Sequence, residues 1–579
     1  MIENNNTSKN TIGIFITSLD DDYNEMLCKG FEDYAKENDV NAIYVIGGPL
    51  HVSFHPYEAH SNILYDLIDT TNVDGLIISS ASLGVFTTEI KLREFVQKYS
   101  NLPIISLGTK LQDTTNILID NRQGMRDLIR HIIEGHNARR IAFIKGSEGN
   151  YDAKIRYQAY KEILNEFKIP IEEELIFQGN FTLLSGKFCT STLLNKGIQF
   201  DAIVAANDAM ALGAIQELKK RGVNIPEDAL VTGFDNTFTS SFSNPPLTTI
   251  KQPVYQQGIE AMKKIISMIK DKHRSEDIVL PTELIIRKSC GCIPESSAES
   301  IINAYKNSDD SKNDDLSIDL DKIITEIQKS NIYENFKMNP ILVQDLLTTF
   351  INEITGKNEN IFLNKFQGLV EDIIPYDQDL KDWIDITKMF QKFSLFYRSN
   401  KDCQSKSEKI LEKARKIINN TIEQFEAYQS NKMDLNIKNL VNAIDLLNSN
   451  FVLSEINSIA CKTLPKLGFN YIYASLFDEE NLPSNNSKLI IACDSQDDFQ
   501  LSKDGFIYPT KKLIPDNIFN KKKRYSFIIQ SLIFKNEVPY GFFIFNYNPE
   551  LIHFYINRHL SNALKGAFIY KELNKIKSK

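Results

Sequence analysis

Long apolar runs, cysteine and clustered positive charge are all scarce in this chain. No apolar run reaches the roughly 20 residues that a membrane-spanning helix needs, and the polar start MIENNNTSKN lacks the apolar core of a secretory signal. Seven cysteines among 579 residues favour a reducing compartment over a disulfide framework. The net charge of −9 argues against a broad nucleic-acid-binding surface. We therefore expect a cytoplasmic protein with no membrane partner.

Catalytic and cofactor motifs are also missing. The chain has no His-Glu-x-x-His, no Gly-x-Ser-x-Gly and no G-x-G-x-x-G after a strand. GNFTLLSGKF resembles a phosphate loop only faintly, because Phe188 stands where Ser or Thr is required. Cys290 and Cys292 could form half a metal site, but the sequence places no second pair or histidine cluster near them. We expect no enzyme activity, no catalytic residue, no metal and no cofactor.

The first 290 residues alternate between short apolar runs and amphipathic helical patterns. Such alternation predicts parallel sheets with helices on both faces, and about 280 residues are enough for two α/β lobes. The predicted strands lie at 11–17, 41–48, 73–80, 102–108, 140–146, 201–208 and 230–236.

The pattern changes twice after Cys292. A polar stretch reads as a linker, a run of helices with single apolar stripes follows, and an α+β pattern with four strands and a terminal helix ends the chain. The last helix of the run, ending at EAYQ, could pair with a second copy as a coiled coil. The predicted divisions are a tail at 1–10, a two-lobed domain at 11–292, a linker at 293–317, a helical connector at 318–432 and an α+β domain at 433–579.

Two polar residues stand at the junction of a strand and a helix in DAIVAANDAMALGAIQEL, residues 201–218. Asn207 suits a tight turn and Asp208 a helix N-cap, which is the structural interpretation. The functional interpretation is that open α/β sheets bind ligands at the carboxyl ends of their strands. These residues alone leave both interpretations open, and the choice between them depends on the rest of the chain.

Several stretches, taken in order, resemble the effector-binding core of the LacI/GalR family of transcription regulators. They are VDGLIISS, PIISLG, ILIDNRQGMRDLIRHIIEGHNARRIAFIKG, IRYQAYKEIL, GNFTLLSG, IVAANDAMALGAIQEL, VTGFDN and PPLTTIKQP. The resemblance covers residues 11–288 and implies a periplasmic-binding-protein-like fold of two α/β lobes joined by three crossovers. It also implies a small ligand in the cleft between the lobes and a homodimer.

The resemblance assigns six residues to the ligand: Arg156, Asn207, Asp235, Phe181, Tyr23 and Asp20. Carboxylate, amide and guanidinium groups suit hydroxyls, and an aromatic face suits a sugar or a purine. From the residues alone, Arg156 could equally form a salt bridge on a helix and Phe181 could belong to the core.

The family's DNA-reading helix-turn-helix has no room before the first strand at Thr11, so we expect no direct DNA binding. The ending PTELIIRKSCGC resembles a variant in multidomain bacterial signalling proteins, where a LacI-like sensor precedes helices and a GAF-like domain. No recognisable output domain follows here. The leading hypothesis is a ligand sensor that signals to a downstream regulatory protein. The alternatives are a transcription regulator that reaches DNA through a partner or an unrecognised element, and a signalling enzyme with a hidden C-terminal site.

Overall fold

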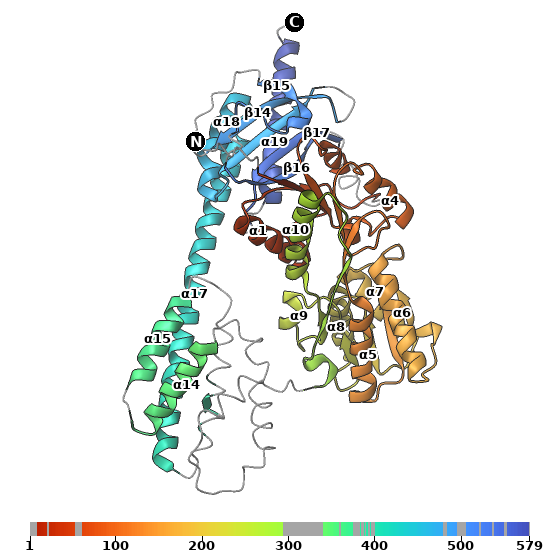
Figure 1. The fold of residues 1–579 in the computed structure, drawn as a ribbon, viewed down its shortest axis with the longest axis vertical. Coiled ribbons are helices and arrows are strands. Elements are labelled where there is room, and N and C mark those ends of the chain that lie inside the picture. The colour runs from red at the N-terminus through yellow and green to blue at the C-terminus, as the bar shows by residue number, and fades with distance from the viewer. Residues whose placement is uncertain are drawn as a thin grey trace. The chain divides into compact units, whose positions relative to one another are not determined.

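The computed structural model divides the chain into two compact units (Figure 1), residues Met1–Cys292 with Asn439–Lys579, and residues Ile293–Lys438. The residues that it describes are 9–19, 22–51, 61–292, 340–357, 360–373, 400–478, 483–494, 505–519, 523–534, 538–548 and 553–577, with single positions between 383 and 394. Among the described helices, none combines the length and the apolar character needed to cross a bilayer.

The first lobe is a parallel sheet whose strands are almost fully buried, as their continuous apolar sequences require. Helices α1 and α10 pack on one face, and η1, α3 and α4 lie toward the other. Its elements are β1 (Thr11–Ile16), α1 (Asp22–Glu37), β2 (Asn41–Ile46), η1 (Asn62–Leu67), β3 (Gly75–Ile78), α3 (Ser80–Leu83), α4 (Glu89–Gln97), β4 (Ile104–Leu107), β5 (Thr115–Ile119), α10 (Val254–Asp271) and β11 (Ile278–Leu280).

The second lobe is a smaller parallel sheet in the order β7-β6-β8-β9, with an apolar core shared by helices α5 to α8. Its elements are α5 (Asn121–His136), β6 (Ile141–Lys145), α6 (Tyr151–Glu166), η2 (Glu173–Leu175), β7 (Ile176–Gln178), α7 (Leu183–Asn195), β8 (Ala202–Ala205), α8 (Asp208–Lys220), β9 (Leu230–Thr232), α9 (Phe238–Phe242), β10 (Thr249–Lys251), β12 (Glu283–Ile285) and η3 (Lys288–Cys290). The seven strands predicted for residues 11–236 are all present across the two lobes.

The chain crosses between the lobes three times, as the two-lobed fold predicts. The first crossover joins β5 to α5, the second joins β10 to α10, and the third joins β11 to β12. The backbone N–H of Asp120 donates to the carbonyl of Leu280, and the hydroxyl of Thr282 donates to the carbonyl of Asp120. The first and third crossovers are therefore hydrogen-bonded to each other.

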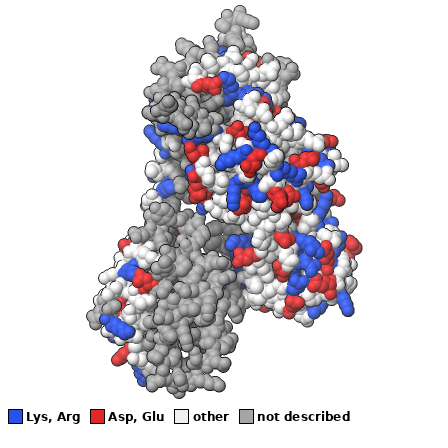
Figure 2. All heavy atoms as spheres, viewed as in Figure 1, with Lys and Arg blue, Asp and Glu red and all other residues white. Residues whose placement is uncertain are grey.

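The surface of the second lobe carries a ladder of ion pairs between α5 and α6. Arg126 and Arg130 both reach Glu166, at 2.5 and 2.8 Å, and Arg122 reaches Glu162 at 2.7 Å. In Figure 2, basic and acidic side chains are interspersed over the described part of the visible face.

The C-terminal module is an antiparallel sheet in the order β16-β17-β13-β14-β15. The sequence predicted four of these strands and missed the short β15. The module's elements are α18 (Leu453–Thr463), η6 (Leu464–Leu467), β13 (Tyr471–Phe477), β14 (Asn486–Asp494), β15 (Phe506–Pro509), η7 (Thr510–Lys512), β16 (Ser526–Phe534), β17 (Val538–Asn546) and α19 (His553–Lys577).

This module continues the sheet of the first lobe. Strand β16 pairs in parallel with the edge strand β2, with Phe527 opposite Ile43. Next to this pairing, the guanidinium of Arg524 donates to the buried carboxylate of Glu32 at 2.7 Å and to the carbonyls of Ala35 and Val40 at 3.1 Å. A single 11-stranded sheet therefore runs through both parts, which the sequence did not predict.

The second unit is described through α14 (Pro340–Ile354), α15 (Ile361–Ile373) and the part of α17 (Lys401–Asn448) that ends at Lys438. The helix predicted at IDLDKIITEI, residues 318–327, lies outside the described residues. The predicted boundary between the helical connector and the α+β domain, at residues 432 and 433, falls inside α17, which is 48 residues long. The stretch NKMDLNIK contains no Gly or Pro, so nothing in it interrupts the helix.

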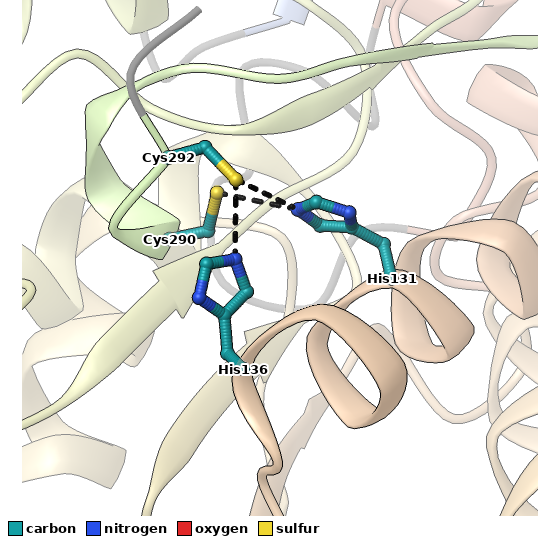
Figure 3. A group of neighbouring side chains, drawn as sticks. All are labelled: His131, His136, Cys290 and Cys292. Atoms are coloured by element: carbon teal, nitrogen blue, oxygen red, sulfur yellow. Dashed lines mark hydrogen bonds between the residues drawn. The ribbon is translucent and has the colours of Figure 1, made fainter.

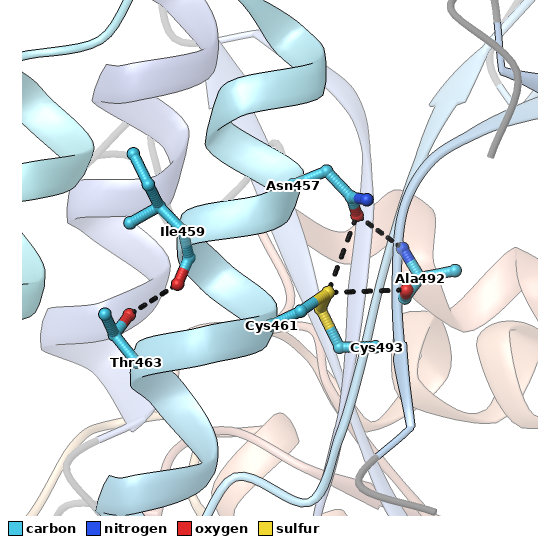
Figure 4. The surroundings of a disulfide bond; sticks show 6 residues. All are labelled: Asn457, Ile459, Cys461, Thr463, Ala492 and Cys493. Carbon is cyan, nitrogen blue, oxygen red and sulfur yellow. Dashed lines mark hydrogen bonds between the residues drawn. A yellow bond between two sulfur atoms is a disulfide. The ribbon is translucent and has the colours of Figure 1, made fainter. Parts of the chain in front are cut away.

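A disulfide joins Cys461 on α18 to Cys493 on β14 (Figure 4). The prediction of reduced cysteines is wrong for this pair in the structure. Asn457, also on α18, accepts a hydrogen bond from the backbone N–H of Ala492, so the helix is held against the strand at two neighbouring points. The 32-residue separation gave no sequence signal for the pairing.

Replacing both cysteines, Cys461→Ala with Cys493→Ala, should lower the stability of the C-terminal module. Closing a loop of 32 residues restricts the unfolded chain and contributes about 3–4 kcal/mol in the chain-entropy picture. Calorimetric melting of the full chain should show one transition that moves down in the double variant. A reductant should move the same transition in the wild type and leave the variant unchanged; equal melting of both proteins without reductant would contradict the prediction.

Candidate functional site

The guanidinium of Arg156, on α6, is the centre of a buried polar cluster. Its Nε donates to Asn121 Oδ1 at 2.7 Å, and its Nη1 donates to the carbonyl of Ala206 at 2.6 Å. The same Nη1 lies 3.5 Å from Asp235 Oδ1. The flat face of the guanidinium covers the Phe234 ring, with the central carbon 3.7 Å from the ring centroid. Only 4 % of Arg156 is exposed, so these contacts replace its hydration.

The cluster sits directly on two of the three crossovers. Asn121 is the first residue of α5, immediately after the crossover from β5. Gln252 lies in the crossover between β10 and α10, and its Nε2 donates to Asp235 Oδ1. Arg156 therefore connects one crossover through Asn121 with the other through Asp235 and Gln252. A ligand that changes the partners of Arg156 or Asp235 acts on groups that also hold the hinge.

Two carboxyl groups flank the single guanidinium. Burial raises the pKa of Asp235 to about 7, although the neighbouring Arg156 acts in the opposite direction. Burial also raises the pKa of Asp152 to about 6, against the opposing effects of Arg156 and a hydrogen bond from Asn121. Near neutral pH this arrangement offers carboxylate acceptors, a carboxyl that can donate, and a fixed cation. These groups suit a neutral ligand rich in hydroxyls.

Asn207, and not Asp208, has the capping role that the sequence suggested for Asp208. Asn207 is the N-cap of α8, since its Oδ1 accepts from the backbone N–H of Met210 at 3.0 Å. Its Nδ2 donates to the carbonyl of Phe181 at 3.1 Å. Asp208 is fully buried inside the helix start and accepts from the hydroxyl of Thr249 at 2.6 Å. The prediction that Asp208 caps the helix is therefore wrong, and the ligand role of Asn207 stays a prediction.

Phe181 is held by close packing at the end of β6. The Phe181 ring packs directly on Gly146. A Cβ atom at position 146 would come within 2.1 Å of the ring, so there is no room for a side chain there. Phe181 has a positive φ of 67°, uncommon for a bulky residue, and its carbonyl accepts from Asn207. The ring is partly buried against the core of the second lobe. Phe181 therefore packs against the core, and its contact with a ligand stays a prediction.

The remaining two predicted residues belong to the first lobe. Tyr23 lies on α1, and its hydroxyl donates to Gln257 Oε1 on α10 at 3.2 Å. Asp20 lies outside the described residues. The structure therefore brings together Arg156 and Asp235, joins Asn207 to Phe181, and places Tyr23 on the other lobe.

A small pocket lies between the lobes, and the described residues of the predicted ligand set do not line it. At its edge, Asn150 Nδ2 donates to the carbonyl of Ala81 across the gap at 3.3 Å. The lining residues are Ala81, Gly84, Thr87, Glu89, Leu92 and Thr109 from the first lobe, and Gly149, Asn150, Tyr151 and Lys154 from the second.

Three polar members of the cluster were not predicted: Asn121, Asp152 and Gln252. Asn121 and Gln252 follow strand ends, in LIDN and TIKQ, where polar residues signal a site in open α/β sheets. Asp152 precedes Arg156 by one helical turn, which puts both side chains on one face of α6. These positional signals were present in the sequence.

Comparison with known proteins gives the class of the domain. A family model described as "Periplasmic binding protein-like domain" matches residues 129–290. The HTH-type transcriptional regulator DegA of Bacillus subtilis is 29% identical over 283 residues, 48% of this chain and 80% of the relative. Catabolite control protein A of Priestia megaterium is 30% identical over 285 residues, 48% of this chain and 81% of the relative. The crystal structure of the transcription regulator CcpA of Lactococcus lactis has a TM-score of 0.42 and 24% identity, covering 48% of this chain and 99% of that one.

The fold is thus a two-lobed, periplasmic-binding-protein-like fold with a polar cluster on its crossovers. The chain belongs to the LacI/GalR family. These relatives match about half of the chain, so the kinship concerns the ligand-binding part. DegA and a further relative, the HTH-type transcriptional repressor CytR of Escherichia coli, carry "HTH-type transcriptional" in their names, so the expectation of no direct DNA binding is not supported.

Asp235→Asn should change how the stability of the domain depends on pH. A carboxyl whose pKa is raised by folding stabilises the folded state at acid pH, below about pH 4, and loses that contribution as the pH rises through about 7. The wild type should lose stability relative to the variant over this range, with about 1.4 kcal/mol for each pKa unit.

Urea unfolding of the full chain at several pH values measures this difference. Asp127→Asn, which changes a 41 %-exposed carboxyl on α5, should keep the pH dependence of the wild type. A constant difference between wild type and Asp235→Asn from acid to neutral pH would show that Asp235 titrates normally.

Proposed function

We propose that the chain is a non-enzymatic, cytoplasmic sensor that binds a small polar metabolite, a sugar or sugar derivative, between its two lobes. The observation that carries the proposal is the Arg156–Asp235 cluster, because its polar groups also hold two crossovers of the hinge. Kinship with the LacI/GalR family supports a ligand-sensing regulatory role. A ligand that prefers one arrangement of these groups shifts the balance between open and closed lobes.

Closure is proposed to reach the C-terminal module through the shared sheet. The pairing of β2 with β16 and the ion pair of Glu32 with Arg524 connect the first lobe to the module, and both groups of this ion pair are largely buried. We propose that this module is GAF-like and that it presents the signal to a downstream regulatory protein. The antiparallel sheet with helices α18 and α19 supports this proposal in architecture.

The ligand role is tested by a thermal-shift screen of the full chain against sugars, nucleosides and amino acids, with and without reductant. Asp235→Asn should weaken binding of any active compound at least tenfold, which corresponds to about 1.4 kcal/mol. Arg156→Ala is a poorer test, because removing a buried cation would expose its partners and destabilise the lobe. Asp127→Asn should retain the wild-type shift; a full shift in Asp235→Asn would place the ligand elsewhere.

A homodimer is also part of the proposal. Helix α19 exposes Ile569, Leu573 and Ile576 at spacings of four and three residues, with exposed fractions of 53 %, 52 % and 69 %. Such spacing forms an apolar stripe along one face, which a second copy of the helix can cover.

Leu573→Asp should convert the dimer to a monomer, because it buries a charge at the centre of this stripe. Light scattering with size-exclusion chromatography measures the mass directly. Asn574→Asp adds the same charge at the next exposed position and should leave the dimer intact. A wild-type monomer at all concentrations, or a dimeric Leu573→Asp, would contradict this interface.

The second candidate is a transcription regulator that acts on DNA through a partner or an unrecognised element. The relatives' printed names favour it. A gel-shift titration against promoter fragments at physiological salt separates the two functions, since the sensor alone should show no specific complex.

A further inference from the structure

Two histidines and two cysteines of the second lobe point toward one another in a single cluster (Figure 3). His131 and His136 come from the last turns of α5, and Cys290 and Cys292 come from the segment after β12. The expectation that no histidine cluster lies near the cysteine pair is therefore wrong, because the fold brings the two histidines next to the cysteines. The two pairs are separated by more than 150 residues in sequence, which hid the cluster.

All four ligand atoms lie within 4.8 Å of one another. A tetrahedral zinc ion holds sulfur at about 2.3 Å and histidine nitrogen at about 2.0 Å, which puts neighbouring ligand atoms about 3.3–3.8 Å apart. Three observed separations are close to this range: Cys290 Sγ to His131 Nε2 at 3.4 Å, Cys292 Sγ to His136 Nε2 at 3.2 Å and Cys292 Sγ to His131 Nε2 at 3.7 Å.

The neighbouring backbone and side chains favour the orientation in which the four groups face one another. Gly291 has a φ of +89°, a conformation that glycine adopts easily, and the turn it makes brings the sulfurs on either side of it toward the histidines. The hydroxyl of Thr248 lies 3.1 Å from Cys290 Sγ as a donor, as expected beside a thiolate ligand. Cys290 is buried, and the other three groups are partly buried.

We propose that His131, His136, Cys290 and Cys292 bind one structural zinc ion. Four protein ligands leave no open position, which is the pattern of structural rather than catalytic zinc. The ion would tie the end of α5 to the last residues of the ligand-binding domain. Cys292 is also the last residue before the second unit begins in sequence, so the chain would leave the lobe from a fixed point.

Metal content of the full chain, purified without chelator or affinity nickel, is the first test. We expect about one zinc per chain by plasma mass spectrometry. After replacement with cobalt, the protein should show the visible absorption of a tetrahedral site and a sulfur-to-cobalt charge-transfer band. The cobalt spectrum of the wild type reports thiolate ligation directly, so this test does not depend on whether a variant folds.

Variants then assign the site. Cys292→Ser and His136→Asn change partly buried ligands and should each lose the bound zinc and the cobalt spectrum, with circular dichroism confirming the fold. His273→Gln, an exposed histidine outside the cluster, should keep both. Removing zinc from the wild type with a chelator should lower its melting temperature and should not affect Cys292→Ser.

Three results would overturn the proposal. The first is zinc well below one per chain that dialysis removes, and the second is full zinc retention in Cys292→Ser. The third is a disulfide between Cys290 and Cys292 in the purified protein, detected by mass spectrometry of the non-reduced peptide. The zinc site and the ligand cleft have separate readouts, so failure of one leaves the other standing.

Discussion

The burial of the Arg156 guanidinium is the constraint on which the ligand-binding part depends. A buried cation is tolerated only when its hydrogen-bonding capacity is filled. Here an amide oxygen, a backbone carbonyl and a carboxylate lie within hydrogen-bonding distance of its Nε and Nη1, and an aromatic ring lies against the guanidinium. Two of these partners stand on or beside crossovers between the lobes. The same contacts that stabilise the second lobe therefore restrain the hinge, and a polar ligand can change both together.

The sheet of the first lobe is continuous with the sheet of the C-terminal module. Strand β2 would be an unprotected edge in the isolated first lobe, open to pairing with any other strand. Strand β16 covers this edge, and the Arg524–Glu32 ion pair fixes the junction where both side chains have lost most of their water. The two sheets are joined here by the backbone hydrogen bonds of the β2–β16 pairing.

Elements with local signals could be predicted, and contacts between distant residues could not. Strands such as β1 and β8 are apolar runs bounded by polar turns, so their positions could be predicted from the sequence. Kinship placed Arg156 and Asp235 together. The cap at Asn207 rather than Asp208 depends on backbone angles one residue apart. The Cys461–Cys493 disulfide, the β2–β16 pairing and the His–Cys cluster all depend on tertiary packing, for which one sequence carries no pattern.

Hydrogen exchange of the full chain, with and without a saturating metabolite from the screen, most directly tests the coupling of ligand to hinge. Closure through the Arg156 cluster should slow exchange of the backbone amides at residues 119–122 and 250–254, on the two crossovers, and along β2 and β16. Protection confined to other parts of the chain, with both crossovers unchanged, would contradict the central claim.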